Sequence, residues 1–308
     1  MIRVVGKRGK GSFESQLDDA AKGKEFVKID CTSGNPDPVM REGLSPFYLG
    51  PVECYDGLVS QTFERAWQCA KVYPWTRGAD GNPNANYFAW RDEMWAMKGF
   101  EDKMSIRFPV GRENVRKCCY VWWKVDGEFR KLGYIDGRKY IYLPLYAKTV
   151  VKKEAYRRLV ELHGSGKNLM LIDFDGYNIH HPKYNFTYND AIHCPLLKMG
   201  HGFILAMLLE GLIHVDENGE VTYADGLMDN PNRTYSRDLR TLTEEQKLER
   251  GAKAAGVTLG EWKALSPSDR TLLRKAAKKE NAYSRGFTKA AWKRLPMAEK
   301  FAILRGVR

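Results

Sequence analysis

Residues 44–73, LSPFYLGPVECYDGLVSQTFERAWQCAKVY, hold the strongest local pattern of this chain, and the rest of the sequence is interpreted around them. Pro46 marks a turn, and an Asp-Gly pair marks a second turn after a short extended run. A helix is predicted to follow, with Ser60 or Thr62 as its N-cap and Pro74 just beyond its last residue. The stretch therefore predicts a turn, a short hairpin and a helix in immediate succession.

Three polar side chains share one stripe of the predicted helix. Glu64, Gln68 and Lys71 follow one another at i, i+4 and i+7, beside Trp67. A carboxylate, an amide and an ammonium in this order can form part of a polar site. The same spacing is also found on solvent-exposed helix faces, where a Glu64–Lys71 contact contributes little to stability. Both interpretations stay open at this point.

The same residues resemble the opening of the NADAR (YbiA-like) family, whose members have S-N-F-Y-P, a short hairpin and T-x-E-H-Y-x-Q-x-x-K. The matching residues here are Ser45, Phe47, Tyr48, Thr62, Glu64, Gln68 and Lys71. The chain is also similar to a related uncharacterised group with the pattern DVTS…SPFYP…WQ..KV. That pattern is matched by Asp30, Thr32, Ser33, residues 45–48 and residues 67–72. Arg65 departs from the family, which has His after the glutamate.

The resemblance implies an N-glycosidase that hydrolyses a ribose–base or ribose–amine bond in an ADP-ribosylated nucleotide or a modified nucleic acid. Such a bond breaks through an oxocarbenium-like state, which needs a carboxylate near the anomeric carbon and a base that activates water. We expect Glu64 in the first role and Asp173 in the second. The expected substrate-binding residues are Ser45, Phe47, Tyr48, Gln68, Lys71, Trp90, Asp175, Tyr177 and His201. No cofactor and no metal are expected.

The second informative stretch is NLMLIDFDG, residues 168–176. An apolar run of this kind predicts a buried strand, and Asp173 and Asp175 would share one face if the strand persists. Carboxylates at the end of a buried strand are typical of a site, although they also cap turns. The later run GHGFILAMLLEG predicts an apolar helix from Gly202 whose N-terminus suits a phosphate, with His201 as a proton carrier or a cap.

The remaining pattern predicts an α+β fold, with short strands and amphipathic helices in alternation. Strands are predicted over residues 2–6, 26–31, 106–110 and 119–125, and helices over residues 13–21, 87–100 and 150–163. Residues 132–149 are predicted as a strand or short helix that Pro144 breaks. This segment contains a basic-aromatic run, Arg138, Lys139, Tyr140 and Tyr142, which either faces a phosphate or forms a solvated face. Trp90 or Trp95 corresponds to a tryptophan of the NADAR family or is a core residue.

Length and composition indicate one large domain or one domain with a small appendage. The chain has 308 residues and 43% hydrophobic residues, which is enough for a sizeable core. No apolar run approaches the ~20 residues of a membrane span, so no membrane contact is expected. The six cysteines show no paired metal spacing, and the His and Cys residues of the 176–201 segment fit no compact zinc signature. Reduced thiols and a cytoplasmic location are therefore expected.

The net charge of +12 is unevenly distributed. Residues 233–308 hold 19 Lys and Arg against 8 Asp and Glu, while the remaining residues hold 31 against 30. A nearly neutral body and a basic tail indicate two functional parts. We expect a NADAR-like catalytic domain over residues 1–228, a linker over residues 229–235, and a basic all-α appendage over residues 236–308.

The tail contains a weak internal repeat. The pattern around Trp262 recurs thirty residues later around Trp292, which predicts two small helical units with a tryptophan core. The cationic side chains between and around them are expected to contact DNA or RNA, or else to serve a protein partner. The expected nucleic-acid contacts are Lys275, Lys278, Lys279, Arg285, Lys293 and Arg294. Two alternatives to the hydrolase remain: a non-catalytic nucleic-acid-binding protein, and a ribosyl or ADP-ribosyl transferase that uses the same carboxylate.

Overall fold

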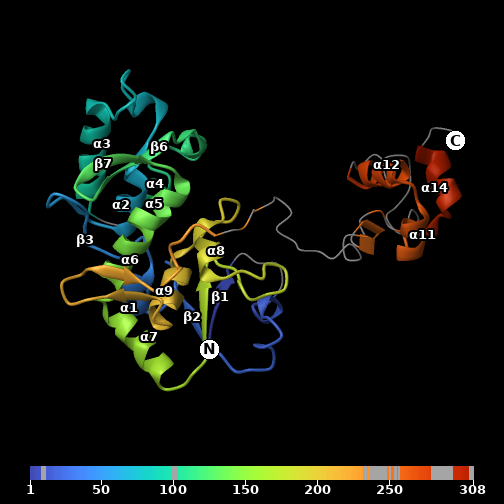
Figure 1. Ribbon diagram of the computed structural model, residues 1–308, viewed down its shortest axis with the longest axis horizontal. Helices are drawn as coiled ribbons and strands as arrows, with labels where there is room; N and C mark the ends of the chain where they lie inside the picture. Colours follow the sequence, from blue (N-terminus) through green and yellow to red (C-terminus); the bar gives the residue numbers. More distant parts are fainter. Residues whose placement is uncertain are drawn as a thin grey trace. The chain divides into compact units, whose positions relative to one another are not determined.

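The computed structural model describes residues 1–7, 12–98, 103–231, 233, 235, 248–249, 251–252, 255, 257–278 and 294–304. The chain divides into two compact units, Met1–Leu239 and Arg240–Arg308 (Figure 1). The first unit combines helices with parallel and antiparallel strands, so the α+β class is correct at the level of mixed helix and strand. No helix in the described part of the chain is long and apolar enough to cross a membrane.

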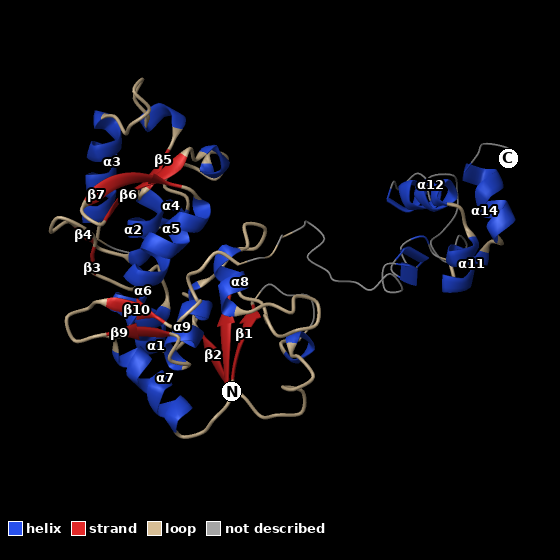
Figure 2. Ribbon diagram, in the orientation of Figure 1, coloured by secondary structure: helices blue, strands red, loops and turns tan. Residues whose placement is uncertain are grey.

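The first unit contains a three-stranded parallel sheet. Its strands are β1 (Ile2–Gly6), β8 (Leu169–Asp173) and β2 (Val27–Asp30), with β8 between the other two (Figure 2). Every residue of β8 is buried, as expected for a central parallel strand covered on both faces. Because the strands are parallel, Asp173 lies at the same edge as Gly6 and the residues that follow Asp30.

Helices surround this sheet. Helix α9 (His201–Leu209) packs on β1 and β8, α6 (Leu143–Val150) packs on α9, and α1 (Pro38–Leu44) packs on α7 (Glu154–Gly164). Nearly all of α9 is buried, because its sequence is apolar on every face. The core of the first unit therefore continues from the parallel sheet through α9 into α6.

A second, antiparallel sheet is formed by β5 (Lys71–Val72), β6 (Tyr120–Val125) and β7 (Glu128–Leu132). A turn at Asp126-Gly127 joins β6 to β7, and both residues have positive φ (51° and 81°). Helices α2 (Phe63–Cys69) and α3 (Ala85–Ala96) accompany this sheet, at the opposite end of the first unit from β1, β8 and β2 (Figure 2).

The smaller elements connect these layers. They are the hairpins β3 (Val52–Glu53) with β4 (Val59–Ser60) and β9 (Ile213–Val215) with β10 (Val221–Tyr223), the helices α4 (Lys103–Arg107), α5 (Tyr134–Gly137) and α8 (Tyr188–His193), the π-helix η4 (Arg138–Tyr142), and the 3₁₀ turns η1 (Glu14–Gln16), η2 (Pro74–Thr76) and η3 (Val115–Lys117).

The helix predicted over residues 13–21 is wrong, since only the 3₁₀ turn Glu14–Gln16 forms there. The Gln16 side chain explains the difference. Its amide nitrogen donates to the Gly6 carbonyl oxygen (3.0 Å), and its oxygen accepts the Gly6 N–H (2.8 Å). This pairing with the end of β1 directs the chain into an extended conformation, and Leu17 then packs on the parallel sheet.

Three further local predictions are wrong. The strand over residues 106–110 is replaced by α4, and the motif helix ends at Cys69 because Lys71 and Val72 pair with β6 as β5. Residues 134–150 are helical throughout, with Pro144 near the start of α6 directly after the π-helix η4. Pro144 has no N–H to donate, and it is tolerated because it follows the π-helix η4, where the Leu143 N–H bonds to the Arg138 carbonyl and the i−4 pattern is already interrupted.

The described part of the second unit includes helices α11 (Leu259–Ala264), α12 (Pro267–Lys278) and α14 (Met297–Leu304). Trp262 is 1% exposed and packs with Ala252, Ala255 and Leu273 in a small core of its own, as the repeat predicts. Thr258 and Glu261 form a capping box at the start of α11. Trp292, the second tryptophan of the repeat, lies outside the described residues.

Candidate active site

The turn at Pro46 is bound directly to the start of helix α2. The Glu64 N–H donates to the Pro46 carbonyl oxygen (2.9 Å), and the Phe63 N–H donates to the Leu49 carbonyl oxygen (2.7 Å). The Thr62 hydroxyl accepts the Arg65 N–H (3.2 Å), which confirms Thr62 as the N-cap. The first N–H groups of α2 thus find their acceptors in the preceding turn. This pairing fixes the turn beside Glu64.

The polar stripe on α2 is a connected hydrogen-bond chain. The Gln68 amide donates to Glu64 Oε1 (2.9 Å), and the Lys71 ammonium donates to Gln68 Oε1 (2.5 Å). The Lys71 ammonium also lies 4.9 Å from the centre of the Trp67 ring. Glu64 is only 8% exposed. The stripe is therefore a partly buried network, and the solvated-face interpretation of it is wrong.

Burial shifts the pKa values of Glu64 and Lys71, the two ends of this hydrogen-bond network. Desolvation raises the pKa of Glu64, and the Gln68 hydrogen bond and the charges of Lys71 and Arg107 oppose that rise only in part. Desolvation lowers the pKa of Lys71, against the opposing attraction of Glu64. Glu64 is consequently a better proton donor near neutral pH than an ordinary glutamate.

The opposite wall comes from the carboxyl end of β8. Asp173 is buried, and its Oδ2 accepts the Gly202 N–H at the start of α9 (2.8 Å). Its Oδ1 accepts the Asp175 N–H (3.3 Å). A Cβ atom at Gly200 would lie 2.1 Å from Asp173 Oδ2, so only glycine fits that close approach. The helix N-terminus that the sequence suggested for a phosphate is thus occupied by the protein's own carboxylate.

His201 connects Asp173 to the end of β2. Its Nε2 lies 2.8 Å from the Cys31 carbonyl oxygen, and its Nδ1 lies 3.3 Å from Asp173 Oδ2. A carbonyl oxygen only accepts, so Nε2 bears a proton. His201 therefore binds β2, β8 and α9 together.

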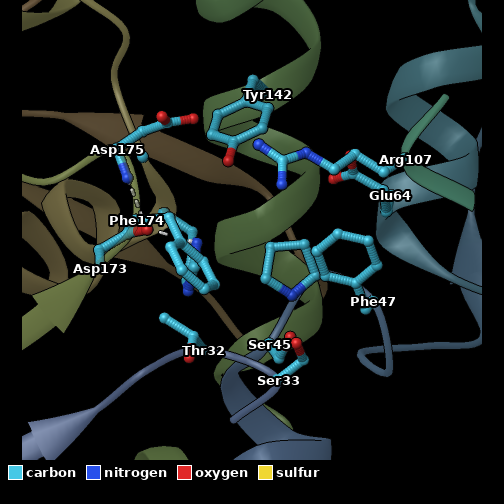
Figure 3. Close-up of a pocket in the computed structure, with 13 residues that line it drawn as sticks. Thr32, Ser33, Ser45, Phe47, Glu64, Arg107, Tyr142, Asp173, Phe174 and Asp175 are labelled. Atoms are coloured by element: carbon cyan, nitrogen blue, oxygen red, sulfur yellow. Dashed lines mark hydrogen bonds and ion pairs between the residues drawn. The ribbon is translucent and has the colours of Figure 1, made fainter. Parts of the chain in front are cut away.

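These two walls enclose a small pocket with a free volume of about 70 Å³ (Figure 3). It is lined by Thr32, Ser33, Ser45, Pro46, Phe47, Glu64, Arg107, Tyr142, Asp173, Phe174, Asp175, Gly200 and His201. Figure 3 shows the Tyr142 hydroxyl and the Arg107 guanidinium between the Glu64 side and the aspartate side. The Ser45 hydroxyl is fully buried and has no hydrogen-bond partner among the described residues.

A larger cleft of about 700 Å³ adjoins this pocket, and Glu64, Arg107, Tyr142 and Asp175 line both. The cleft is rich in cationic and aromatic groups. They are Lys71, Arg107, Arg112, Arg138 and Lys198, with Trp67, Phe108, Tyr120, Tyr134 and Tyr142. The combination of a narrow acidic pocket and a wide basic cleft suits a ligand with one reacting end and an anionic remainder.

Arg138 is a structural residue within this cleft. Its guanidinium donates to the carbonyl oxygens of Ile192 (3.0 Å) and Cys194 (2.8 Å), and it also contacts the carbonyl of Leu197. It is 2% exposed. The phosphate-binding alternative for Arg138 is therefore wrong, because its donors are used to hold the segment after α8.

The structure brings six of the expected site residues to the small pocket and two more to the cleft. The pocket residues are Ser45, Phe47, Glu64, Asp173, Asp175 and His201, and the cleft residues are Gln68 and Lys71. Three others line neither. The Tyr48 ring lies under the Arg41 guanidinium, Trp90 packs against Tyr73 and Tyr87, and Tyr177 packs against Tyr184 and Phe203 in the core.

Several lining residues were not predicted as site residues. Arg107 is the most important, because it faces both cavities from α4, a segment predicted as a strand. Tyr142 was considered only as part of a basic-aromatic run, and burial together with the charges of Asp173 and Glu64 raises its pKa well above the usual range. A helical periodicity through Pro144 is the signal that identifies Tyr142 as inward-facing.

The tail residues expected to contact nucleic acid are only partly described. Lys275 and Lys278 belong to α12, and Arg294 is exposed. Lys279, Arg285 and Lys293 lie outside the described residues. Within the described ranges, no group of three His, Cys, Asp or Glu side chains has the arrangement of a metal site. All six cysteines fall in those ranges and are free thiols.

No protein-family model matches this chain, no curated protein matches it, and no solved structure matches it. Of the seven motif residues singled out in the sequence, five line the two cavities: Ser45, Phe47, Glu64, Gln68 and Lys71.

Proposed function

We propose that this chain is an N-glycosidase-type hydrolase, with a NADAR-like catalytic domain over residues 1–228. The bond it cleaves joins a ribose to a base or an amine in a ribosylated nucleotide or nucleic acid. The observation that supports this most directly is the pair of carboxyl groups facing one pocket, Glu64 and Asp175, in different environments. Enzymes that hydrolyse glycosidic bonds usually use two carboxyl groups with separate catalytic roles.

In the proposed reaction Glu64 is the acid, a different role from the carboxylate near the anomeric carbon that the sequence suggested, because burial raises its pKa. Its carboxyl proton passes to the leaving nitrogen as the C1′–N bond breaks, and the charge left on the ribose is oxocarbenium-like. A water molecule adds its oxygen to C1′ and gives a proton to Asp175. The products are the free base or amine and a ribose hemiacetal. The raised pKa of Glu64 favours the protonated form that this step requires.

The role of water-activating base falls to Asp175 in place of Asp173. Both oxygens of Asp173 accept backbone N–H groups, and one of them also faces His201. Asp175 is half-buried, lines both cavities, and is contacted by Lys198 at 3.5 Å. Asp173 is therefore a positioning residue, which holds Asp175 and the start of α9 in place.

Polar groups of the pocket provide contacts for the sugar. The buried Ser45 hydroxyl is directed to the same space as Glu64 and can bond a ribose hydroxyl. Arg107 and Tyr142 lie between the two carboxyl groups, where a cation opposes excess negative charge and a phenol donates a hydrogen bond. The cationic cleft beyond them suits the phosphate groups of a nucleotide.

The test is incubation of the purified chain with ribosylated nucleosides, ADP-ribosylated bases and NAD, followed by mass spectrometry of the products. Free base together with free ribose or ADP-ribose supports hydrolysis. A ribosyl group found on a new acceptor indicates the transferase alternative. Binding without any product indicates the non-catalytic alternative.

A second function, nucleic-acid binding by the tail, is favoured by the charge distribution, since residues 233–308 hold 19 basic against 8 acidic residues. Deletion of residues 236–308 keeps Tyr235, whose hydroxyl donates to Asp190 (3.0 Å) in the first unit. The deletion is expected to leave turnover of a small nucleoside unchanged and to weaken binding to DNA or RNA. Gel-shift titrations at several salt concentrations measure this, with a log–log slope of about −0.9 per phosphate neutralised on duplex DNA. Equal affinity of both chains would assign the tail to a protein partner.

A further inference from the structure

The outer face of the antiparallel sheet has an unusual composition. Along β6 the side chains of Val121, Trp123 and Val125 are buried, so Tyr120, Trp122 and Lys124 alternate onto the opposite face. On β7, Lys131 is directly opposite Trp122, and Phe129 is directly opposite Lys124. Aromatic rings and lysines therefore alternate across this face.

The rings of this face pack against one another and are partly exposed. Trp122 and Phe129 are stacked, with ring centres 5.4 Å apart and an angle of 2° between the planes. Phe129 is 41% exposed. The Lys124 ammonium lies 5.8 Å from the Phe129 ring, and the Lys131 ammonium lies 5.7 Å from the Tyr120 ring. Exposed rings flanked by ammonium groups are the arrangement on which nucleobases stack.

Two cations gather at one end of this face. A Cβ at Gly81 would lie 3.2 Å from the Arg77 guanidinium and 3.5 Å from the Lys131 ammonium, and the Tyr120 hydroxyl donates to the Gly81 carbonyl (2.7 Å). The nearby carboxylate of Asp80 accepts hydrogen bonds from the Asn82 backbone and side chain (3.0 and 2.9 Å).

Arg77 and Lys131 differ from the neighbouring cations in their ion pairs. Lys124 is paired with Asp56 and Arg130 with Asp126. Within the described ranges neither Arg77 nor Lys131 forms an ion pair closer than 4 Å, although the charge of Lys131 contributes to the lowered pKa of Asp80. Arg77 and Lys131 are thus available to phosphate groups.

The face continues into the cleft of the candidate active site. Tyr120, the first residue of β6, lines the 700 Å³ cleft together with Arg112 and Glu64. The cleft is also lined by Val121 and Leu132, which belong to the opposite face of the sheet. A linear ligand that lies along the outer face of β6 therefore reaches the cleft by turning around the Tyr120 end of the sheet.

We propose that the outer face of β6 and β7 binds a single-stranded polynucleotide and leads it into the cleft. The inference rests on the proposed function for the hydrolysis in the cleft. It deepens that function by naming the substrate as a nucleotide within a strand. A single strand fits better than a duplex because paired bases do not expose their ring faces for stacking. Cations that form no close ion pair match the phosphate backbone of a strand. An apolar protein partner with few acidic residues would not neutralise them.

The experiment uses the full-length chain and fluorescently labelled 20-mers of dT, of U and of a mixed-sequence duplex, titrated at three salt concentrations. Phe129→Ala removes the exposed ring, and Lys131→Ala removes the cation beside Tyr120. Matched controls are Tyr140→Ala, an exposed ring on η4, and Lys167→Ala, an exposed lysine before β8 at the other edge of the parallel sheet. Circular dichroism establishes that all four variants are folded.

We expect Phe129→Ala to weaken single-strand binding about 5- to 100-fold, the range for loss of one stacking ring. Lys131→Ala should weaken it less and reduce the salt slope by close to one phosphate. The control variants and duplex binding should change less than twofold. The dT and U arms tell whether the strand is DNA or RNA.

Single-strand affinity that is unchanged in both Phe129→Ala and Lys131→Ala overturns the inference, as does an equal loss in the controls. Turnover is measured separately. Base release from a free mononucleotide with no effect of Phe129→Ala on strand binding would keep the hydrolase and reject the binding face. Binding that depends on Phe129, without base release from any substrate, would support the face and reject the hydrolase.

Discussion

The two walls of the candidate active site are acidic, but they hold their carboxyl groups in different ways. On α2, Glu64 accepts a hydrogen bond from a side chain, the Gln68 amide, within a network that ends at Lys71. At the end of β8, Asp173 accepts two backbone N–H groups and faces His201. The first carboxyl group is buried with side-chain support, and the second is fixed by the main chain.

This difference indicates separate roles for the two carboxyl groups. Backbone donors stabilise a carboxylate and keep it in place, which suits a positioning role. Burial with few donors makes the protonated form more accessible, which suits an acid catalyst. The comparison teaches that, of two buried acids in one pocket, the one with fewer main-chain contacts is the better candidate for proton transfer. Four predictions test it.

The largest expected effect is on catalysis at the α2 wall. Glu64→Gln keeps the shape and the Gln68 contact but removes the transferable proton, so turnover should fall by roughly two to four orders of magnitude with the fold intact. Glu128→Gln, an exposed glutamate on β7, is the control and should be fully active. Steady-state kinetics with circular dichroism measure both. Normal turnover by Glu64→Gln would make Glu64 a structural carboxyl group.

The next effect is on stability at the β8 wall. Asp173→Ala removes the acceptor of the Gly202 N–H and the partner of His201, so the free energy of unfolding should fall by about 2–4 kcal/mol. Asp175→Ala should cost less than about 1 kcal/mol, because among the described residues its carboxylate forms an ion pair with Lys198 alone. Urea denaturation followed by tryptophan fluorescence compares the two. Similar losses in both variants would contradict the distinction between the aspartates.

A smaller loss is expected from crowding the same wall. Gly200→Ala places a Cβ 2.1 Å from Asp173 Oδ2, and the start of α9 must shift to avoid it. The expected cost is about 1–3 kcal/mol. Gly211→Ala makes a poor control because its φ is +71°, whereas Gly164 has no atom near its Cβ position and no positive φ. Gly164→Ala should therefore leave stability nearly unchanged in the same denaturation experiment.

The smallest effect concerns the pH dependence of stability. The pKa of Glu64 is raised in the folded state from its ordinary value of 4.5, so above that pH the folded chain binds more protons than the unfolded chain. Its contribution to stability should therefore fall as pH rises through the window from 4.5 to the raised value, by about 1.4 kcal/mol for each unit of the rise.

Thermal unfolding from pH 4 to pH 8 measures this slope as a difference between the unmodified chain and Glu64→Gln, which lacks the titrating group. A variant curve parallel to that of the unmodified chain would show that Glu64 has the same pKa in both states.

Local sequence rules determined the α2 wall. The Thr62 cap, the Asp-Gly turn of the hairpin and the i, i+4, i+7 stripe from Glu64 to Lys71 depend on residues within a few positions of one another. The apolar run of β8 and its terminal Asp173 were likewise evident, because a fully buried strand requires continuous hydrophobic residues. For these elements the local sequence pattern is itself the physical cause of the structure that forms.

Only the tertiary structure decided which of these groups meet. Gly202 lies 29 residues beyond Asp173, and no spacing rule links the start of α9 to the end of β8. Arg107 was missed because α4 was mistaken for a strand, and α2 ends at Cys69 because β5 pairs with β6 about fifty residues later. Local periodicity specifies faces and caps. The partner of each face is selected by burial and hydrogen bonding across the whole fold, and those contacts decide which carboxylate is fixed and which can release its proton.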